Sequence, residues 1–418
     1  MSLAHEPSLA ALAASPRAFG KLPALAGAPA AFRFAARLLA LNWRAGTLTF
    51  TTPSGRELRI KGSEPGAEAR IIVHDFAFMR RVLAAGDIGF AEGYMAGEWD
   101  TPDLSAVLCA MSLNFDRLAR FFLGNPLMRA VNFVGHRLHA NTRKGSRKNI
   151  HAHYDLGNAF YSQWLDRTMT YSSARYERRG QPLDQAQTNK YRSLAHGMGL
   201  ETDQSVLEIG CGWGGFAEFA AKEVGAKVTG ITISQEQFDF ARKRIFDQGL
   251  NERAEIRMID YRDVEGRFDR VASIEMFEAV GERYWPTYFG KIQQVLNPGG
   301  RAGLQIITIR DEIFDAYRRR ADFIQKYIFP GGMLPSEARL KSETTRAGLA
   351  WTGITRFGQD YADTLAEWGK RFESAWDEIA TLGFDARFRK LWRFYLSYCE
   401  AGFRTERTNV VQLSLAKA

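Results

Sequence analysis

Cysteine is scarce in this sequence, and long apolar runs are absent from it. The 418 residues include three cysteines, Cys109, Cys211 and Cys399, which are widely spaced and form no CxxC pair. Their odd number and spacing argue against a disulfide framework. No run of about 18 apolar residues occurs, so the sequence predicts no transmembrane helix. The seven histidines do not cluster with cysteines or acids at metal-ligand spacing, so we expect no metal site.

Acidic residues are outnumbered, which limits the expected partners. The chain has 56 Lys and Arg against 47 Asp and Glu, a formal net charge of +9. This surplus favours anionic partners, namely nucleic acid, phospholipid headgroups or phosphorylated substrates, and is equally compatible with a charge that only aids solubility. With 45% apolar and 25% charged residues, the composition excludes a disordered or collagenous chain. Residues 1–33 lack the pattern of a signal peptide, so we expect a flexible tail on a cytoplasmic protein.

Residues 34–140 have the pattern of a small α+β domain. Apolar and polar residues alternate on both sides of the turn at 53–55, which predicts a β-hairpin. Residues 76–85 and 103–112 predict short helices. Glycines and aromatics fill residues 86–100 between them, and we expect a compact, buried turn region there.

Residues 141–418 predict one larger catalytic domain. Repeated strand–helix units predict a doubly wound, Rossmann-like parallel sheet covered on both faces, with ligands at the carboxyl ends of the strands. A capping box at Ser234 and Gln237 marks the start of one helix. The aromatic-rich insertion between residues 308 and 349 predicts either a lid over the substrate or a small core of its own. The strands are expected at 206–209, 227–233, 255–260, 270–274, 301–308 and 349–357, and the helices at 215–224, 234–249 and from Pro286 to the turn at 297–300.

Two groups of basic residues are candidate contacts for an anionic surface. Residues 137–148 contain five basic residues and no acidic one, which indicates either a solvated linker or a patch that faces phospholipid. The second group is Arg318, Arg319 and Arg320. Near an anionic bilayer each such residue contributes on the order of 1 kcal/mol.

A glycine-rich loop, LEIGCGWGG at 207–215, follows a predicted strand and opens a predicted helix. Gly210, Gly212 and Gly214 allow a tight turn and a close approach of the backbone to a ligand. Glu208 at the strand end completes a combination typical of class I S-adenosylmethionine (SAM) methyltransferases. A nicotinamide dinucleotide site would have an acid at the end of the second strand, where this chain has 230–232, Gly-Ile-Thr.

Further residues are expected at the cofactor. Thr232 and Gln237 can bind the ribose through neutral hydrogen bonds, and Asp260 can reach the adenine amine. Cys211, inside the glycine loop, is expected to pack beside the cofactor. The remaining candidates for SAM binding are Tyr171, Ser172 and Tyr261.

Seven segments are long enough to be compared with known families. They are HYDLGNAFYSQWLDRTMTYSSARY (153–176), the glycine loop, TISQEQ (232–237), DYRD (260–263), MFEAVG (276–281), YIFPGGMLPS (327–336) and GQDYADTL (358–365). Together they resemble the cyclopropane-fatty-acyl-phospholipid synthases, and the resemblance extends over residues 35 to 415. It implies a SAM-dependent enzyme that adds a methylene carbon across a double bond of an acyl chain in a membrane phospholipid. Mycolic-acid cyclopropane and methyl synthases are similar proteins.

The chemistry that the resemblance implies needs an apolar site, a group that stabilises a carbocation, and a base. Aromatic faces can stabilise the cation, and a base must remove a proton from the added methyl group to close the ring. In the family this base is thought to be a bound bicarbonate. The resemblance places its holders at Glu278, Tyr361, Ser173 and the backbone amide of Ile309.

Two of the matched positions depart from the family. Ser173 replaces a cysteine, and its hydroxyl can still bind an anion. Ile307 replaces a histidine and offers no donor, so a bicarbonate would lose a ligand. A slower or displaced base leaves time for a hydride shift, and the product is then a branched chain instead of a ring. The sequence favours ring closure and leaves methyl-branched, methylene or furan-precursor products as the alternative.

Cys399 matches a cysteine proposed as a nucleophile in the family, although the chemistry above has no step that needs a thiolate. We expect a structural role for it. The resemblance also implies that residues 34–140 contact lipid or a second subunit, in a possible homodimer. It predicts an enzyme at the inner face of the membrane, with unsaturated phospholipids as substrate and no nucleic acid partner. An RNA methyltransferase and a lipid-binding protein with a degenerate SAM site are the rival readings.

Overall fold

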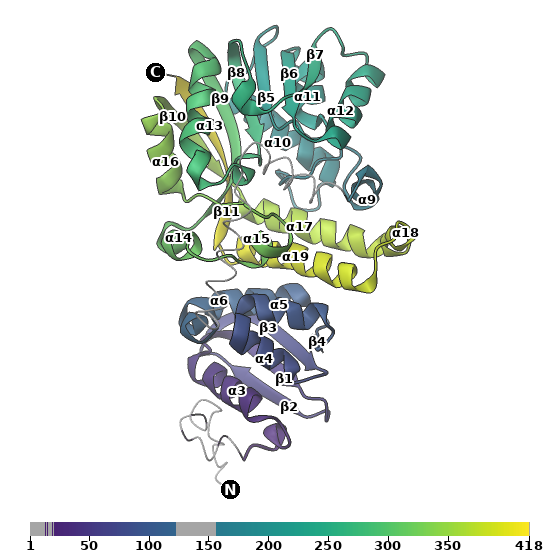
Figure 1. Cartoon of the computed structure of the whole chain (residues 1–418), viewed down its shortest axis with the longest axis vertical. Helices are drawn as coiled ribbons and strands as arrows, with labels where there is room; N and C mark the ends of the chain where they lie inside the picture. The colour runs from purple at the N-terminus through teal and green to yellow at the C-terminus, as the bar shows by residue number, and fades with distance from the viewer. Residues whose placement is uncertain (1–12, 14, 16–18, 20, 123–155, 418) are drawn as a thin grey trace. The chain divides into compact units, whose positions relative to one another are not determined.

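The computed structural model describes residues 13, 15, 19, 21–122 and 156–417 (Figure 1). The basic segment 137–148 and most of the predicted tail therefore lie outside the described residues. The chain forms two compact units. Unit 1 comprises Met1–Val134, Arg320–Phe323 and Phe384–Thr405, and unit 2 comprises Gly135–Arg319, Ile324–Gly383 and Glu406–Ala418. The sequence analysis predicted a single boundary between the two domains, near residue 140. In the structure the helix α19 (Ala386–Arg404), from the C-terminal part of the chain, also belongs to unit 1.

Unit 1 is built on a four-stranded sheet with the order β2-β1-β3-β4. The predicted hairpin is present, since β1 pairs antiparallel with β2 and Thr51 lies opposite Glu57. The helix α6 packs on β1 and β3, and α19 packs on α5 and α6. The strands are β1 (Ala45–Thr51), β2 (Glu57–Lys61), β3 (Glu64–Val73) and β4 (Trp99–Asp100), and the helices besides α19 are η1 (Pro23–Leu25), α3 (Ala30–Asn42), α4 (Ala77–Ala85), α5 (Asp87–Met95) and α6 (Leu104–Phe122).

The expectation of a turn region at residues 86–100 is wrong, because α5 occupies most of it. Its glycines serve close packing. A Cβ at Gly89 would lie 2.0 Å from the carbonyl oxygen of Arg81, and one at Gly93 would lie 2.9 Å from the Cβ of Phe78. Glycine here lets α5 approach α4, an effect that outweighs its low helix propensity.

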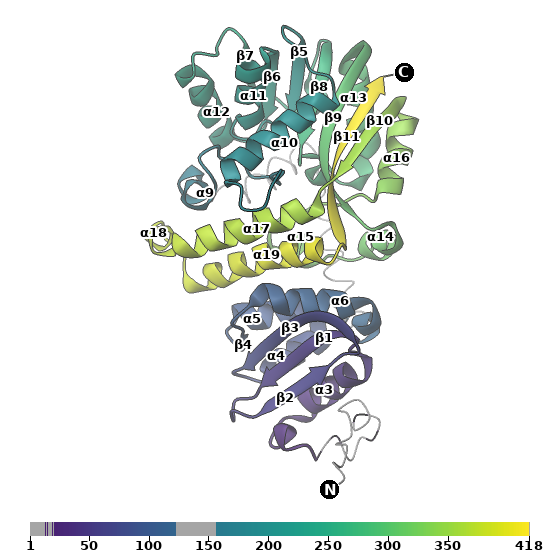
Figure 2. The same ribbon diagram turned by 180° about the vertical axis from the view of Figure 1, so that it is seen from behind.

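Unit 2 contains a seven-stranded sheet with the order β10-β11-β9-β8-β5-β6-β7 (Figures 1 and 2). Five neighbouring strands, β9, β8, β5, β6 and β7, run parallel to one another, as predicted. The strand β11 pairs antiparallel with both β9 and β10. The sequence analysis did not predict β11, which lies between the two predicted strands β9 and β10. The strands are β5 (Ser205–Ile209), β6 (Lys227–Thr232), β7 (Ala254–Met258), β8 (Phe268–Ile274), β9 (Leu296–Ile309), β10 (Leu349–Arg356) and β11 (Thr408–Lys417).

Helices cover both faces of this sheet because its central strands are apolar on both sides. In β5, Val206 packs among residues of α10, α11 and α12. Leu207 and Ile209 face the other way and pack among residues of α13 and α16, as the alternation of a strand requires. The helices are α9 (Asn158–Trp164), α10 (Leu183–Gly197), α11 (Gly215–Phe219), the π-helix η2 (Ala220–Val224), α12 (Gln235–Asp247), α13 (Trp285–Val295), α14 (Asp311–Tyr317), α15 (Phe323–Tyr327), α16 (Glu337–Arg346), α17 (Gly358–Ser374) and α18 (Trp376–Thr381), with 3-10 turns η3 (Tyr261–Asp263), η4 (Phe277–Ala279) and η5 (Glu282–Tyr284).

The local signals for these helices worked where capping chemistry was visible. The side chain of Ser234 accepts a hydrogen bond from the backbone amide of Gln237, and α12 begins at the next residue. The turn expected at 297–300 is instead part of β9, which begins at Leu296 directly after α13. Within the residues that the structure describes, no helix combines the length and apolar character needed to cross a membrane.

Candidate active site

The glycine loop lies between β5 and α11, at the carboxyl end of the sheet. Gly210, Gly212 and Gly214 have φ values of 79°, 52° and 82°, a region that residues with a side chain rarely adopt. A Cβ at Gly210 would lie 2.6 Å from the Cγ of Met276, whereas one at Gly212 would meet nothing within 4 Å. The loop is therefore closed on one side by Met276 and open beside Gly212, as close approach of a ligand to the backbone requires.

Three of the residues expected at the cofactor are Glu208, Thr232 and Cys211, whose surroundings the structure describes. Glu208 is buried, burial raises its pKa, and its Oε2 has no hydrogen-bond partner among the described residues. The hydroxyl of Thr232 donates to Oε1 of Gln237 over 2.9 Å. Burial also raises the pKa of the Cys211 thiol, which suits a packing role.

The Asp260 carboxylate is already engaged by a cation. It accepts hydrogen bonds from Nε and Nη2 of Arg262, at 2.8 and 2.6 Å. The ring of the next residue, Tyr261, lies 5.5 Å from that of Tyr288, and burial raises the pKa of Tyr261 to about 12. The Asp260 side chain is thus held in one orientation, and the Tyr261 phenol is neutral.

Tyr171 and Ser172 lie on a segment that packs against aromatics and a buried lysine. The ring of Tyr171 lies 5.6 Å from Trp164 and 5.4 Å from Trp368. Oγ of Ser172 accepts a hydrogen bond of 2.6 Å from Nζ of Lys190. The sequence analysis missed Lys190, which is fully buried on α10.

A second cluster lies at the end of β8. Oε1 of Glu278 accepts a 2.5 Å hydrogen bond from the backbone amide of Ile307, and its buried Oε2 has no partner among the described residues. Burial, followed by the charge of Glu275, raises the pKa of Glu278 to about 8. At neutral pH this carboxyl group is therefore mostly protonated.

The central group of this cluster is Glu275, which the sequence analysis also missed. Its carboxylate accepts hydrogen bonds from the amide of Ser173 at 2.8 Å, from Nε2 of Gln305 at 2.7 Å and from the hydroxyl of Tyr361 at 2.6 Å. Its φ of 50° is positive, which is uncommon outside glycine and a mark of functional sites. Burial raises its pKa, opposed in order by Tyr361, Lys190 and the other donors.

Three of the four holders that the resemblance assigned to a bicarbonate already have partners within the chain. The amide of Ile309 donates to the carbonyl of Pro335 at 2.9 Å. The hydroxyl of Ser173 donates to the carbonyl of Ala174 at 2.8 Å, and Tyr361 donates to Glu275. Glu278 keeps one oxygen, Oε2, without a partner among the described residues. One such atom does not make an anion site, so the residues as arranged do not fit a bound bicarbonate.

Signals for the missed residues were present in the sequence. The segment IEMFE (274–278) holds two acids, three residues apart, at the end of a strand. Gln305 and Gln412 interrupt the short apolar stretches at 304–307 in β9 and 410–413 in β11. Buried polar residues need partners, so such an interruption indicates a polar network.

Two further features of the sequence can be located in the structure. Cys399 belongs to unit 1, and burial raises the pKa of its thiol, which disfavours the thiolate and is consistent with the structural role expected for it. In the arginine group, Arg318 pairs with Glu282 at 2.7 Å and Arg320 pairs with Asp87 at 3.1 Å. The contact of this group with an anionic surface stays a prediction.

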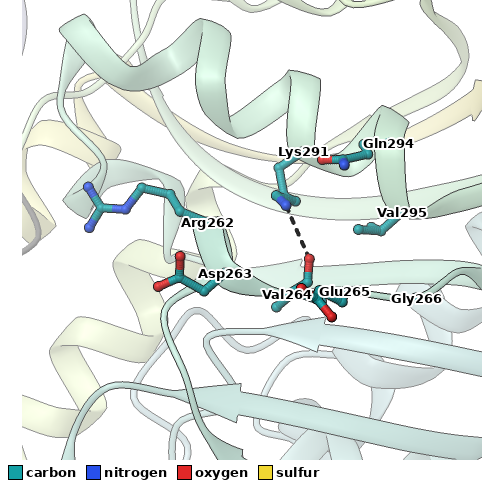
Figure 3. Close-up of a pocket in the computed structure, with 8 residues that line it drawn as sticks. All are labelled: Arg262, Asp263, Val264, Glu265, Gly266, Lys291, Gln294 and Val295. Atoms are coloured by element: carbon teal, nitrogen blue, oxygen red, sulfur yellow. Dashed lines mark hydrogen bonds between the residues drawn. The ribbon is translucent and has the colours of Figure 1, made fainter.

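A hollow of about 390 Å³ lies beside the cofactor region (Figure 3). Nζ of Lys291 donates to the carbonyl of Val264 across it, at 3.1 Å. The hollow contains neither the glycine loop nor Glu275 or Glu278, so it is distinct from the candidate active site. Its lining is Arg262, Asp263, Val264, Glu265, Gly266, Lys291, Gln294 and Val295.

Comparison with known proteins decides among the enzymes that use such a loop. The family described as mycolic acid cyclopropane synthetase matches residues 141–413. The chain belongs to this family. As a cyclopropane synthetase family member it is a SAM-dependent enzyme that transfers a one-carbon unit, and the cyclopropanation or methylation of fatty acyl chains is the family's reaction.

Two full-length relatives differ in their product. The chain is 39% identical over 368 residues to the tuberculostearic acid methyltransferase UfaA1 of Mycobacterium tuberculosis, covering 85% of this chain and 84% of that protein. It is 34% identical over 366 residues to the cyclopropane-fatty-acyl-phospholipid synthase of Escherichia coli, covering 86% and 90%.

The fold agrees with that of solved family members. The mycolic acid cyclopropane synthase CmaA1, in complex with SAH and CTAB, superposes with a TM-score of 0.62 at 27% identity. The match covers 65% of this chain and 98% of that structure. SAM fits the residues present, because the backbone is open beside Gly212 and the side chains of Thr232 and Gln237 are neutral.

Proposed function

We propose that this enzyme methylates a double bond of unsaturated acyl chains in membrane phospholipids and releases a branched, methylene-bearing chain without closing a ring. The observation that carries the proposal is the Glu275 carboxylate, which is half-buried and held by Tyr361, Gln305 and Ser173 at the place where a bound base was expected. Ring closure, which the sequence favoured, becomes the second candidate.

The residues present can manage the reaction as follows. Bound SAM supplies an electrophilic methyl group. The ring of Trp368 lies 5.4 Å from that of Tyr171 and 6.2 Å from that of Tyr361, and these rings offer π-faces to a carbocation on the acyl chain. A hydride shift moves the cation to the carbon that bears the new methyl. Glu275 then accepts a proton from that methyl, and the electrons of the broken C–H bond form a C=CH2 branch on the chain.

The substrate and its location are part of the same proposal. The net charge of +9 and the E. coli relative named for a phospholipid substrate support action on anionic bilayers from the cytoplasmic side of the inner membrane. In this proposal unit 1 contacts either the bilayer or a second copy of the chain in a homodimer.

Product analysis tests the proposal. The purified full chain is incubated with SAM that carries 13C in the methyl group and with vesicles of phosphatidylglycerol that carry one cis double bond per acyl chain. A methylene branch and a cyclopropane have the same mass, so proton NMR must distinguish them. Signals of a 13C-labelled =CH2 group support the proposal, and labelled cyclopropyl signals establish the second candidate. Absence of any transfer to the lipid contradicts both.

A further inference from the structure

Lys190 is a fully buried cation next to the candidate active site. Its Nζ donates to Oγ of Ser172 at 2.6 Å and lies 4.7 Å from the ring centroid of Tyr191. A buried charge is costly unless a charge of opposite sign lies near it. The mechanism above assigns Lys190 no step, so its burial requires a separate explanation.

One hydrogen-bonded path connects the Lys190 ammonium group to Glu275, and a second connects the Lys190 backbone to it. The first runs along the chain, because Lys190 binds the hydroxyl of Ser172 and the amide of the next residue, Ser173, binds the Glu275 carboxylate. The second runs through two glutamines. Nε2 of Gln412 donates to the carbonyl of Lys190 at 3.1 Å and to Oε1 of Gln305 at 3.0 Å. Nε2 of Gln305 then donates to Glu275.

We propose that Lys190 is a positioning residue that keeps the Glu275 carboxylate ionised and aimed at the substrate. The inference rests on the proposed function, in which Glu275 accepts a proton. A base must be unprotonated before it reacts, and burial alone would leave this carboxylate protonated at neutral pH. A cation linked to it through Ser172 and the amide of Ser173 offsets that effect.

The charges around the pair are consistent with this role. Burial lowers the pKa of Lys190 to about 7, and the carboxylates of Glu275, Asp166 and Glu208 oppose that change. For Glu275, burial raises the pKa, while Tyr361 and Lys190 are the largest opposing influences. The two residues therefore stabilise each other's charged forms, and removing one changes the protonation of the other.

The test compares Lys190→Met, Glu275→Gln, the double variant and the control Lys222→Met. Lys222 is exposed on η2, where it binds Gln248, so its loss should leave activity unchanged. We expect Lys190→Met to move the acid limb of the kcat–pH profile upward by about one unit or more, with a Kd for SAM within about threefold of the parent. The double variant should be no slower than Glu275→Gln, because the two residues act as one unit.

An acid limb that stays in place in Lys190→Met, or additive losses in the double variant, would overturn the inference. A weaker Kd for SAM with an unchanged pH profile would also overturn it, since Lys190 would then serve the cofactor.

A stability measurement keeps the inference separate from the proposed function. In Lys190→Met the neutral form of Glu275 is favoured further, so thermal stability should fall as pH rises from 6 to 8, and the fall should be smaller in the double variant, where Glu278 still titrates and position 275 does not. Equal dependence in both variants contradicts the coupling, even if the enzyme proves to act on a different lipid.

Discussion

The hydroxyl of Tyr361, on α17, donates a hydrogen bond of 2.6 Å to the carboxylate of Glu275, at the end of β8. The two residues are 86 positions apart in the sequence; Tyr361 is buried and Glu275 is half-buried. The resemblance to cyclopropane synthases assigned Tyr361 to a bound anion. In this chain the anion that Tyr361 meets is supplied by the protein.

Replacing Glu275 by Gln should therefore stop proton removal and leave cofactor binding intact. We expect methyl transfer to fall about 100-fold or more, the usual range for loss of a general base, with a Kd for SAM within about twofold by calorimetry. The matched control is Glu255→Gln, an exposed glutamate on the edge strand β7 that pairs with Arg257, and it should retain full activity. Full turnover in Glu275→Gln would show that another group is the base.

The product should change when the Glu275 carboxylate is removed, so that a bicarbonate has space to bind, and a hydrogen-bond donor for that anion is added at position 307. In Glu275→Gly/Ile307→His the glycine accommodates the positive φ of position 275, and the histidine supplies the donor that the family resemblance expects. With bicarbonate added, we expect cyclopropyl signals in the proton NMR spectrum of the lipid. Ile307→His alone should keep the branched product, because Glu275 remains. A ring from the single variant would mean that Ile307, not Glu275, decides the outcome.

The glycine loop gives a prediction about the cofactor alone. In Gly210→Ala the new methyl group meets Met276, and the φ of 79° is unfavourable, at a cost of about 1–2 kcal/mol. Met276 or the loop must move, so we expect SAM affinity to fall about tenfold. Gly249→Ala is the control, since Gly249 has a φ of 67° after α12 and nothing within 4 Å of a Cβ. It should cost similar stability, measured by thermal unfolding, without weakening SAM binding.

The sequence predicted the parts of unit 2 whose signals are local. Short apolar runs predicted the strands β5 to β8, and the capping residue Ser234 predicted the start of the helix α12. Both signals lie within a few residues of the element that they predict. It missed β11, whose place between β9 and β10 depends on pairing with residues 99 to 115 positions earlier in β9 and 55 to 68 positions earlier in β10. It missed Glu275 and Lys190 for the same reason. The glycine loop was sufficient to predict the class of cofactor. The hydrogen-bond partners of Ser173 and Ile309 depend on how the backbone folds, so the sequence did not predict them.

Glu278 should make the folded state less stable as pH rises. Its folded pKa of about 8 lies above its ordinary value of 4.5, so the folded state retains a proton that the unfolded chain loses. This stabilisation is complete below about pH 4.5 and is lost as pH rises through 8, with about 1 kcal/mol of the loss between pH 7 and 9. Glu278→Gln retains an acceptor for the Ile307 amide and removes the titrating group. Urea unfolding at pH 7 and 9 should therefore show a smaller decrease for Glu278→Gln than for the parent chain. Equal decreases in the two proteins would mean that the carboxyl group is ionised in the folded state, and that Glu278 is a second anion beside Glu275.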